Sequence, residues 1–183
     1  MMKHPIKIDR QKISLRDIEI EDAVFLMGLN NDLEIAKYVV GNPKQVTLEE
    51  QMQWMENLKL ERQTKRFIIE YDGLPVGTII ISNIDLLNSV ANINIKLQSF
   101  ARGKGIGRQS VFLALEYSFL KMKIYCITAH VLPFNEASLA LFKSCGFVQE
   151  GILRSRVIKN NKRFDLVSFS ITYSDFARIS QEV

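Results

Sequence analysis

The chain has 183 residues, enough for one domain with a full hydrophobic core and short for two, so we expect residues 1–183 to form a single domain. Its composition is ordinary for a globular protein, with 47% hydrophobic and 24% charged residues. The net charge of +4 allows an anionic ligand, but no basic run or aromatic-interleaved basic stripe indicates nucleic-acid binding. The longest apolar runs are far too short to span a bilayer and no signal peptide is visible, so we expect a cytoplasmic protein with no membrane partner.

Cysteine and histidine are too scarce to indicate a metal site. Cys126 and Cys145 are too few for a disulfide framework and lack the spacing of metal ligands. There are only two histidines, and one of them, His4, lies close to the N-terminus, so we expect no histidine-based metal site. We therefore predict no metal ion.

The first half of the chain predicts two helices and then three antiparallel strands. In order, we expect a strand over Lys12–Arg16, a helix from Asp22 to about Leu29, a loop over Asn30–Pro43, a helix that begins at Thr47, a hairpin of Arg66–Tyr71 with Val76–Ser82, and a strand over Val90–Leu97. Asp72-Gly73 marks the hairpin turn, and Glu50 completes a capping-box pattern with Thr47.

The second half alternates helices and strands. We expect a helix from Gln109 to about Met122, a strand over Tyr125–Val131, a short helix that starts at Asn135 and ends before Gly146, and two strands, Phe147–Leu153 and Asp165–Tyr173, joined across a turn at residues 160–162. Because Tyr125–Val131 follows a helix, it should lie parallel to Val90–Leu97 through a right-handed crossover. The order predicts an α/β or α+β domain with a mixed sheet.

The stretch Phe100–Val111 places three glycines and three basic residues between a strand and a helix. Glycine lets the backbone approach a ligand closely, and the first N–H groups of the helix point outward at its positive end. Neither the Rossmann fingerprint nor the Walker A loop fits the spacing, whereas basic-x-x-Gly-x-Gly fits as Arg102, Gly105 and Gly107. The stretch therefore predicts a phosphate site, with a tight, basic, solvated turn as the alternative.

The motifs downstream of this loop resemble the GNAT acyl-CoA-dependent N-acetyltransferases over nearly the whole chain. The resemblance rests on Arg102–Gly107, Asn135–Ser138, Cys145–Phe147 and Glu150–Arg154 in this order. It is strongest to the branch of ribosomal-protein N-terminal, spermidine and amino-sugar acetyltransferases. The resemblance implies a mostly antiparallel sheet with flanking helices and a parallel, splayed central pair of strands.

The resemblance also implies which residues hold acetyl-CoA, the acetyl donor. Backbone N–H groups of the glycine loop would bind the pyrophosphate, the strand before it would pair with the pantetheine arm, and the next helix would contact that arm. Carried onto this sequence, the residues are Arg102, Gly103, Lys104, Gly105, Ile106, Gly107 and Arg108 for the loop, Ile95, Lys96 and Leu97 for the strand, and Asn135 for the helix. A helix N-cap is the alternative role of Asn135.

The expected reaction is direct attack of a primary amine on the thioester. Many relatives carry a tyrosine as general acid where this chain has Phe142, and an acidic residue where it has Asn92 and Asn94. Ser138 is the remaining hydroxyl, so we predict it as the acid, against a purely local capping role. No residue is assigned as base.

The acceptor and the assembly stay open. An amino sugar, a polyamine, an antibiotic and a protein N-terminus all fit the resemblance, which also implies a homodimer. A non-catalytic acyl-CoA sensor of the same fold is the alternative function.

Overall fold

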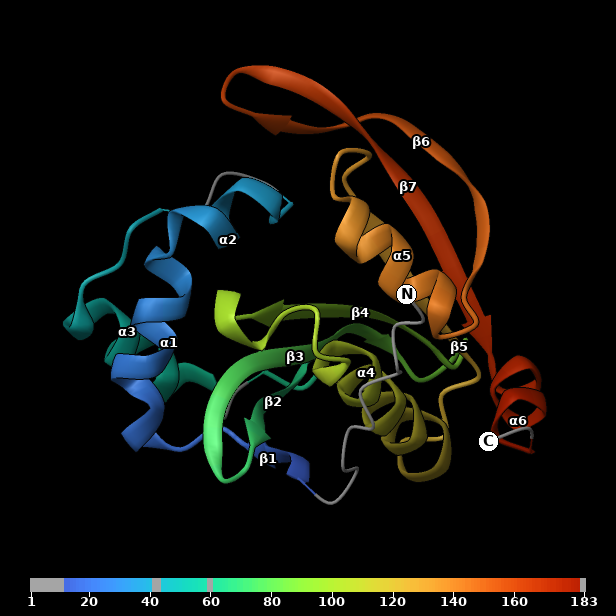
Figure 1. The fold of residues 1–183 in the computed structure, drawn as a ribbon, viewed down its shortest axis with the longest axis horizontal. Helices are drawn as coiled ribbons and strands as arrows, with labels where there is room; N and C mark the ends of the chain where they lie inside the picture. The colour runs from blue at the N-terminus through green and yellow to red at the C-terminus, as the bar shows by residue number, and fades with distance from the viewer. Residues whose placement is uncertain (1–11, 41–43, 59–60, 182–183) are drawn as a thin grey trace, which may run out of the picture.

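The computed structural model describes residues 12–40, 44–58 and 61–181 (Figure 1). In this part of the chain, one seven-stranded sheet has the order β1-β2-β3-β4-β5-β7-β6. The strands are β1 (Ile13–Asp17), β2 (Lys65–Tyr71), β3 (Leu74–Asp85), β4 (Val90–Leu97), β5 (Cys126–Val131), β6 (Val148–Lys159) and β7 (Lys162–Thr172). Every neighbouring pair is antiparallel except β4 and β5, which are parallel. The mixed, mostly antiparallel sheet with a central parallel pair is thus confirmed.

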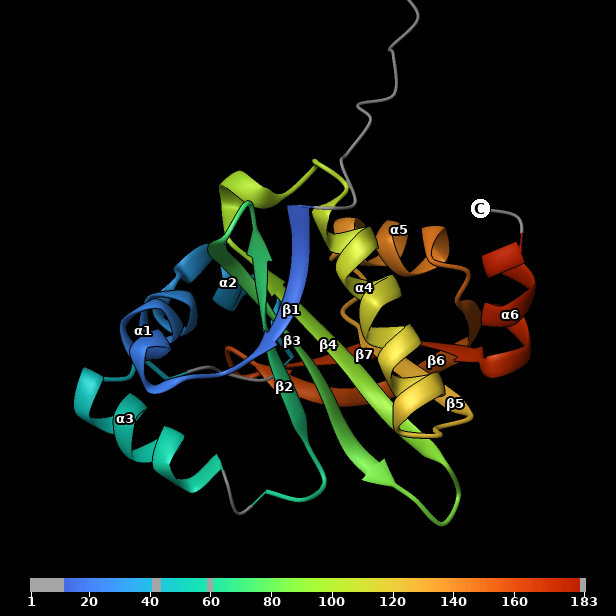
Figure 2. The ribbon, with the colours of Figure 1, turned by 90° about the horizontal axis from the view of Figure 1, so that it is seen from below.

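The helices cover the two faces of this sheet. They are α1 (Ala23–Asn31), α2 (Leu33–Tyr38), α3 (Leu48–Asn57), α4 (Ile106–Glu116), α5 (Glu136–Ser144) and α6 (Tyr173–Gln181). Figure 2 shows α1, α2 and α3 on one side of the strands and α4, α5 and α6 on the other. No helix among the described residues has the length and apolar character needed to cross a membrane.

The main core lies between the sheet and α4. One side of that helix carries an apolar stripe that is buried, with Val111 and Leu115 fully inaccessible to solvent. α4 begins at Ile106, three residues before the predicted start, and continues into a π-helical turn over Tyr117–Lys121. A smaller core, of Ala23, Leu26, Met55 and Ile68, joins α1 and α3 to the opposite face of β2. The sheet is therefore packed on both faces, and both helical layers are fixed against it.

The predicted loop over Asn30–Pro43 is wrong where it contains α2. Asp32, which lies in that predicted loop, is the N-cap of a new helix, because its carboxylate accepts from the N–H groups of Glu34 and Ile35. Residues 41–43 of that loop lie outside the described residues. The chain therefore turns at Asp32 and runs on as a second helix.

The C-terminal end of the last strand also differs from the prediction. β7 ends at Thr172, and Tyr173 begins α6, an amphipathic helix that the sequence analysis did not predict. The Asp175 carboxylate accepts from the N–H and the hydroxyl of Thr172, and the Asp175 N–H donates back to that hydroxyl. These reciprocal bonds end the strand and start the helix within one turn.

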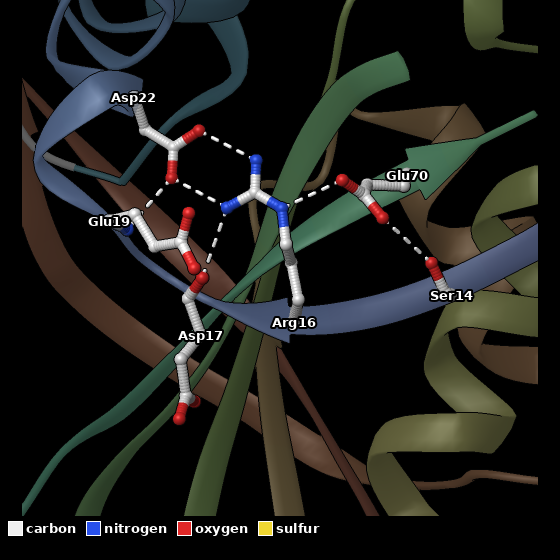
Figure 3. A network of polar contacts seen from close by, with 6 residues as sticks. All are labelled: Ser14, Arg16, Asp17, Glu19, Asp22 and Glu70. Atoms are coloured by element: carbon white, nitrogen blue, oxygen red, sulfur yellow. Dashed lines mark hydrogen bonds and ion pairs between the residues drawn. The ribbon is translucent and has the colours of Figure 1, made fainter. Parts of the chain in front are cut away.

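A partly buried ion pair fixes the point where β1 leads into α1 (Figure 3). The Arg16 guanidinium donates to both carboxylate oxygens of Asp22 at 2.7 Å and to Glu70 on β2 at 2.7 Å. Asp22 also accepts from the N–H of Glu19. Burial alone would raise the pKa of Asp22, but the bonds from Arg16 and Glu19 outweigh it and hold the pKa below its ordinary value. The network therefore locks the first helix to the edge of the sheet.

Candidate active site

The two central strands separate partway along their length. The β4–β5 ladder consists of Val90 with Cys126, Ala91 with Ile127, and Asn92 with Thr128. Beyond these pairs, β4 runs on to Leu97 against β3, and β5 runs on to Val131 against β7. The inner edges of both strands therefore lose their mutual pairing, and β4 offers an open edge to an extended ligand. The splay implied by the resemblance is present.

Glycine on β3 supports the open half of β4 from the other side. Gly77 pairs with Leu97, and a Cβ at Gly77 would collide with the carbonyl oxygen of Lys96. The absent side chain lets the two backbones approach at the point where β4 has no partner on its other edge. The predicted pantetheine-binding residues Ile95, Lys96 and Leu97 thus lie on a strand held firmly from one side.

The glycine loop leads directly from this strand end into α4. Gly103 and Gly105 have φ angles of 71° and 76°, in the left-handed region that disfavours other residues. Gly105 is the N-cap of α4, and no side chain caps the helix. Ile106 is buried in the core, whereas residues 102–105 are exposed. Among the described residues, no side chain accepts from the N–H groups at the start of α4, which leaves them able to bind an anion.

The packing of Gly107 explains the last glycine of the loop. A Cβ there would lie 3.2 Å from Leu97 and 3.6 Å from Leu141. Gly107 therefore lets α4 pack closely against the end of β4 and against α5. In this structure Gly107 allows close packing, and its contact with phosphate stays a prediction.

The two arginines of the loop make contacts within the protein. Arg102 donates through Nε to the carbonyl of Leu97 at 3.0 Å, which ties the loop to the strand. Arg108 donates through Nε to the carbonyl of Ser144 at 3.2 Å and lies over the Phe112 ring at 4.8 Å. Both cations stay exposed beside the loop, so they add positive potential there while they fix its shape.

The start of α5 presents two of the predicted site residues. The side-chain oxygen of Asn135 accepts from the N–H of Ser138 at 3.1 Å, so Asn135 is the N-cap of the helix. The Ser138 hydroxyl has no hydrogen-bond partner among the described residues, and its side chain is half-buried. The hydroxyl is not used for local capping and remains able to donate to a bound group.

Phe142 lies farther along α5 and Cys145 is the C-cap of this helix; both contribute packing. Phe142 is buried, with its ring edge-on to Phe147 at 5.0 Å. Burial raises the pKa of the Cys145 thiol to about 11, and burial also raises the pKa of the Cys126 thiol. Both cysteines are therefore protonated at neutral pH and poor nucleophiles.

A row of polar side chains on the sheet face away from α4 was missed by the sequence analysis. On β5, residues 127, 129 and 131 are buried in the main core, whereas Thr128 and His130 face the other way. Thr128 donates to the Asn92 side chain at 2.5 Å. Beside it, Ser170 on β7 donates to Glu150 on β6 at 2.8 Å. The alternation of apolar and polar side chains along Tyr125–Val131 was the signal in the sequence that could have identified this row.

Lys96 joins the same face of β4 to the first helix. Its ammonium donates to the side-chain oxygen of Asn30 at 2.9 Å, and Asn30 in turn donates to Gln51 on α3. Burial lowers the pKa of Lys96. The side chain thus points toward α1 and α3, while its backbone lies on the open edge. No group of three or more His, Cys, Asp or Glu side chains in the described ranges is arranged to hold a metal ion.

Comparison with known proteins identifies this arrangement. Residues 12–148 match the family model described as an acetyltransferase (GNAT) domain. An N-acetyltransferase of Bacillus licheniformis is 30% identical over 171 residues, 91% of this chain and 96% of its own length. A spermidine N(1)-acetyltransferase of Vibrio cholerae is 27% identical over 172 residues, 93% of this chain and 98% of its own length.

The solved structures agree with these relatives. The crystal structure of spermidine N-acetyltransferase from Vibrio cholerae in complex with CoA and spermine has a TM-score of 0.85, with 26% identity. The similarity covers 91% of this chain and 99% of that one. The shared fold therefore extends over nearly the whole chain.

Proposed function

Because the chain belongs to the GNAT acetyltransferase family, we propose that it transfers the acetyl group of acetyl-CoA directly to a primary amine between β4 and β5. The observation that carries this proposal is the end of the β4–β5 ladder at Asn92 and Thr128, just ahead of the glycine loop. The open edge of β4 can pair with an extended arm that carries amides, and the glycine loop that follows can bind a pyrophosphate. A ligand that contains both groups therefore fits this site.

The donor would be held mainly by backbone groups. N–H groups of residues 102–107 would bind the pyrophosphate, and the open edge of Ile95, Lys96 and Leu97 would pair with the pantetheine amides. The side-chain nitrogen of Asn135, whose oxygen caps α5, would donate to the same arm. Such binding would place the thioester between the splayed strands, and holding two reactants together supplies about 7–11 kcal/mol of a barrier.

Direct transfer is favoured over an acyl-enzyme. Cys126 and Cys145 have raised thiol pKa values, so neither supplies a thiolate at neutral pH. The amine nitrogen would instead attack the thioester carbon itself. Ser138, whose hydroxyl has no partner in the described part of the chain, would then protonate the leaving thiolate.

The charged side chains around the row of polar residues on the sheet bear on how many amino groups the acceptor carries. Lys96 on β4 and Arg156 on β6 are cationic, and Glu150 already accepts from Ser170. A polyamine would bring further positive charges toward these groups. We therefore favour an acceptor with a single amino group, such as a protein N-terminus or an amino sugar. We expect spermidine to have a kcat/KM about tenfold lower, which corresponds to about 1.4 kcal/mol.

A thiol-release assay with acetyl-CoA tests the function. The acceptors are a peptide with a free N-terminus, an amino sugar and spermidine, and CoA binding is measured by calorimetry. Turnover with any of them supports the enzyme. CoA binding without turnover on any amine supports the non-catalytic sensor instead.

The loop assignment has its own test in Gly105→Val. Gly105 has a φ of 76°, so valine would distort the loop, and we expect CoA affinity to fall at least about 100-fold. Gly73→Val is the matched control, because Gly73 has a φ of 78° in the β2–β3 turn and is not part of the glycine loop. Equal CoA affinities of the two variants would contradict the assignment.

A further inference from the structure

His130 occupies a particular position on β5. The last β5 residue paired with β4 is Thr128, and His130 lies two residues farther on, where the strands have separated. Residues on alternate positions of a strand share a face, so His130 faces the same way as Thr128, away from α4. Its imidazole therefore stands at the mouth of the splay, on the face that α4 and the glycine loop leave open.

The amine must approach from this same face. α4 covers the opposite face, with its side chains packed in the main core against β4 and β5. The Lys96 bond to Asn30 shows that α1 lies on the His130 side of β4. A second substrate that enters beside α1, over the separated ends of β4 and β5, would therefore meet the thioester beside His130.

The surroundings of His130 leave its ring nitrogens available. The imidazole is half-buried and makes no hydrogen bond within the described part of the chain, unlike a histidine retained for packing alone. On β7 its cross-strand partner is Ser168, an uncharged residue. The charged groups that act on it are Glu150 and Arg156, both on β6.

The electrostatics keep this imidazole neutral. Burial lowers the pKa of His130 below its ordinary value, Arg156 lowers it further, and Glu150 opposes both. The net direction is downward, so the ring is unprotonated at neutral pH. An unprotonated imidazole can accept a proton, whereas Asn92 and Asn94 on the neighbouring strand have no basic atom.

We propose that His130 is the general base that deprotonates the acceptor amine in the splay between β4 and β5. The proposal rests on the proposed function. The ammonium group of the acceptor gives one proton to the imidazole, and the free amine nitrogen forms a bond to the thioester carbon. The carbon–sulphur bond then breaks, the thiolate takes the second proton from the former ammonium by way of the Ser138 hydroxyl, and the imidazolium releases its proton to water. The products are the acetamide, CoA and one proton.

The test replaces His130 by glutamine, which keeps polarity and approximate size but is not a base. At pH 7 we expect kcat to fall about 100-fold, within the usual range for general-base catalysis, while CoA affinity and melting temperature stay unchanged. The wild-type kcat/KM should rise with pH through a pKa below that of a free histidine, and this limb should vanish in His130→Gln. Imidazole added to His130→Ala should restore part of the rate.

Cys126→Ser is the matched control, because Cys126 lies on the same face of β5 but opposite Val90, where the strands are still paired. It should keep the wild-type rate and pH profile. Wild-type turnover together with an unchanged rate and pH profile in His130→Gln would overturn the proposal for His130 alone. Absence of wild-type turnover on every amine would instead refute the proposed function, so the two failures are distinguishable.

Discussion

At the scale of single residues, Asn135 and Ser138 divide the polar chemistry at the start of α5. The Asn135 oxygen satisfies the Ser138 N–H, which orients the first turn of the helix. The Ser138 hydroxyl then needs no local partner, since the backbone is already capped. Capping by one residue thus leaves the other available for catalysis.

Ser138→Ala should separate catalysis from donor binding. We expect kcat to fall about 100-fold if the hydroxyl protonates the leaving thiolate, with CoA affinity within about twofold of wild type. Steady-state kinetics and calorimetry measure the two quantities. Ser144→Ala is the control, because the Ser144 hydroxyl donates to the Leu141 carbonyl in the same helix and should leave kcat unchanged. An unchanged kcat in Ser138→Ala would rule out its acid role.

At the scale of elements, the pair of Arg16 with Asp22 fixes α1 on the sheet. Asp22 is only 5% exposed. Removing the negative charge of its carboxylate leaves the Arg16 guanidinium without its main partner. Asp22→Asn should lower the free energy of unfolding by about 3 kcal/mol. Asp17→Asn, which affects an exposed pair with Lys65, should lower it by at most about 1 kcal/mol. Urea unfolding at pH 7 compares the two variants.

The same network predicts how stability depends on pH. The pKa of Asp22 is lower in the folded protein than its ordinary 3.8, so the unfolded chain binds more protons in the interval between the two values. The stabilisation is therefore complete above about pH 4 and is lost as pH falls through the folded pKa. Asp22→Asn should lack this part of the acid limb. If the free energy of unfolding of Asp22→Asn falls with decreasing pH as steeply as that of wild type, groups other than Asp22 cause the loss of stability in acid.

How far the sequence predicts each element depends on how local its determinants are. The glycine loop was predictable because chain neighbours alone set its conformation, through Gly103 and Gly105. α2 was missed because Asp32 looks the same whether it ends one helix or caps the next. The role of His130 depends on where two strands separate, and that follows from packing between distant segments. The local sequence pattern therefore predicts the glycine loop of the proposed donor site better than it predicts the residues of the proposed acceptor side.

At the scale of the whole molecule, the β6–β7 hairpin reaches across to α2 (Figure 1). The Lys159 ammonium donates to the carbonyls of Ala36 at 2.7 Å and Val39 at 3.1 Å, at the end of α2. An aromatic series of Tyr38, Phe134 and Phe164 links the same elements, with ring centroids 6.3 and 5.5 Å apart. The N-terminal helices and the C-terminal hairpin are thus joined, on the side from which we propose that the amine approaches.

Lys159→Met tests whether this connection shapes the acceptor side. Lys159 is 7% exposed, so methionine fills a similar volume but leaves two carbonyls without their donor, at a cost of about 1–3 kcal/mol in stability. We expect KM for the amine to rise about tenfold, equivalent to about 1.4 kcal/mol. CoA affinity should stay constant, because these two bonds of the Lys159 ammonium lead to α2, whereas Arg102 ties the glycine loop to β4. Lys162→Met, on the exposed turn of the same hairpin, should change neither quantity. A parallel loss of CoA affinity in Lys159→Met would show that the bond supports the whole fold, whereas a selective rise in amine KM places the acceptor between the hairpin and α2.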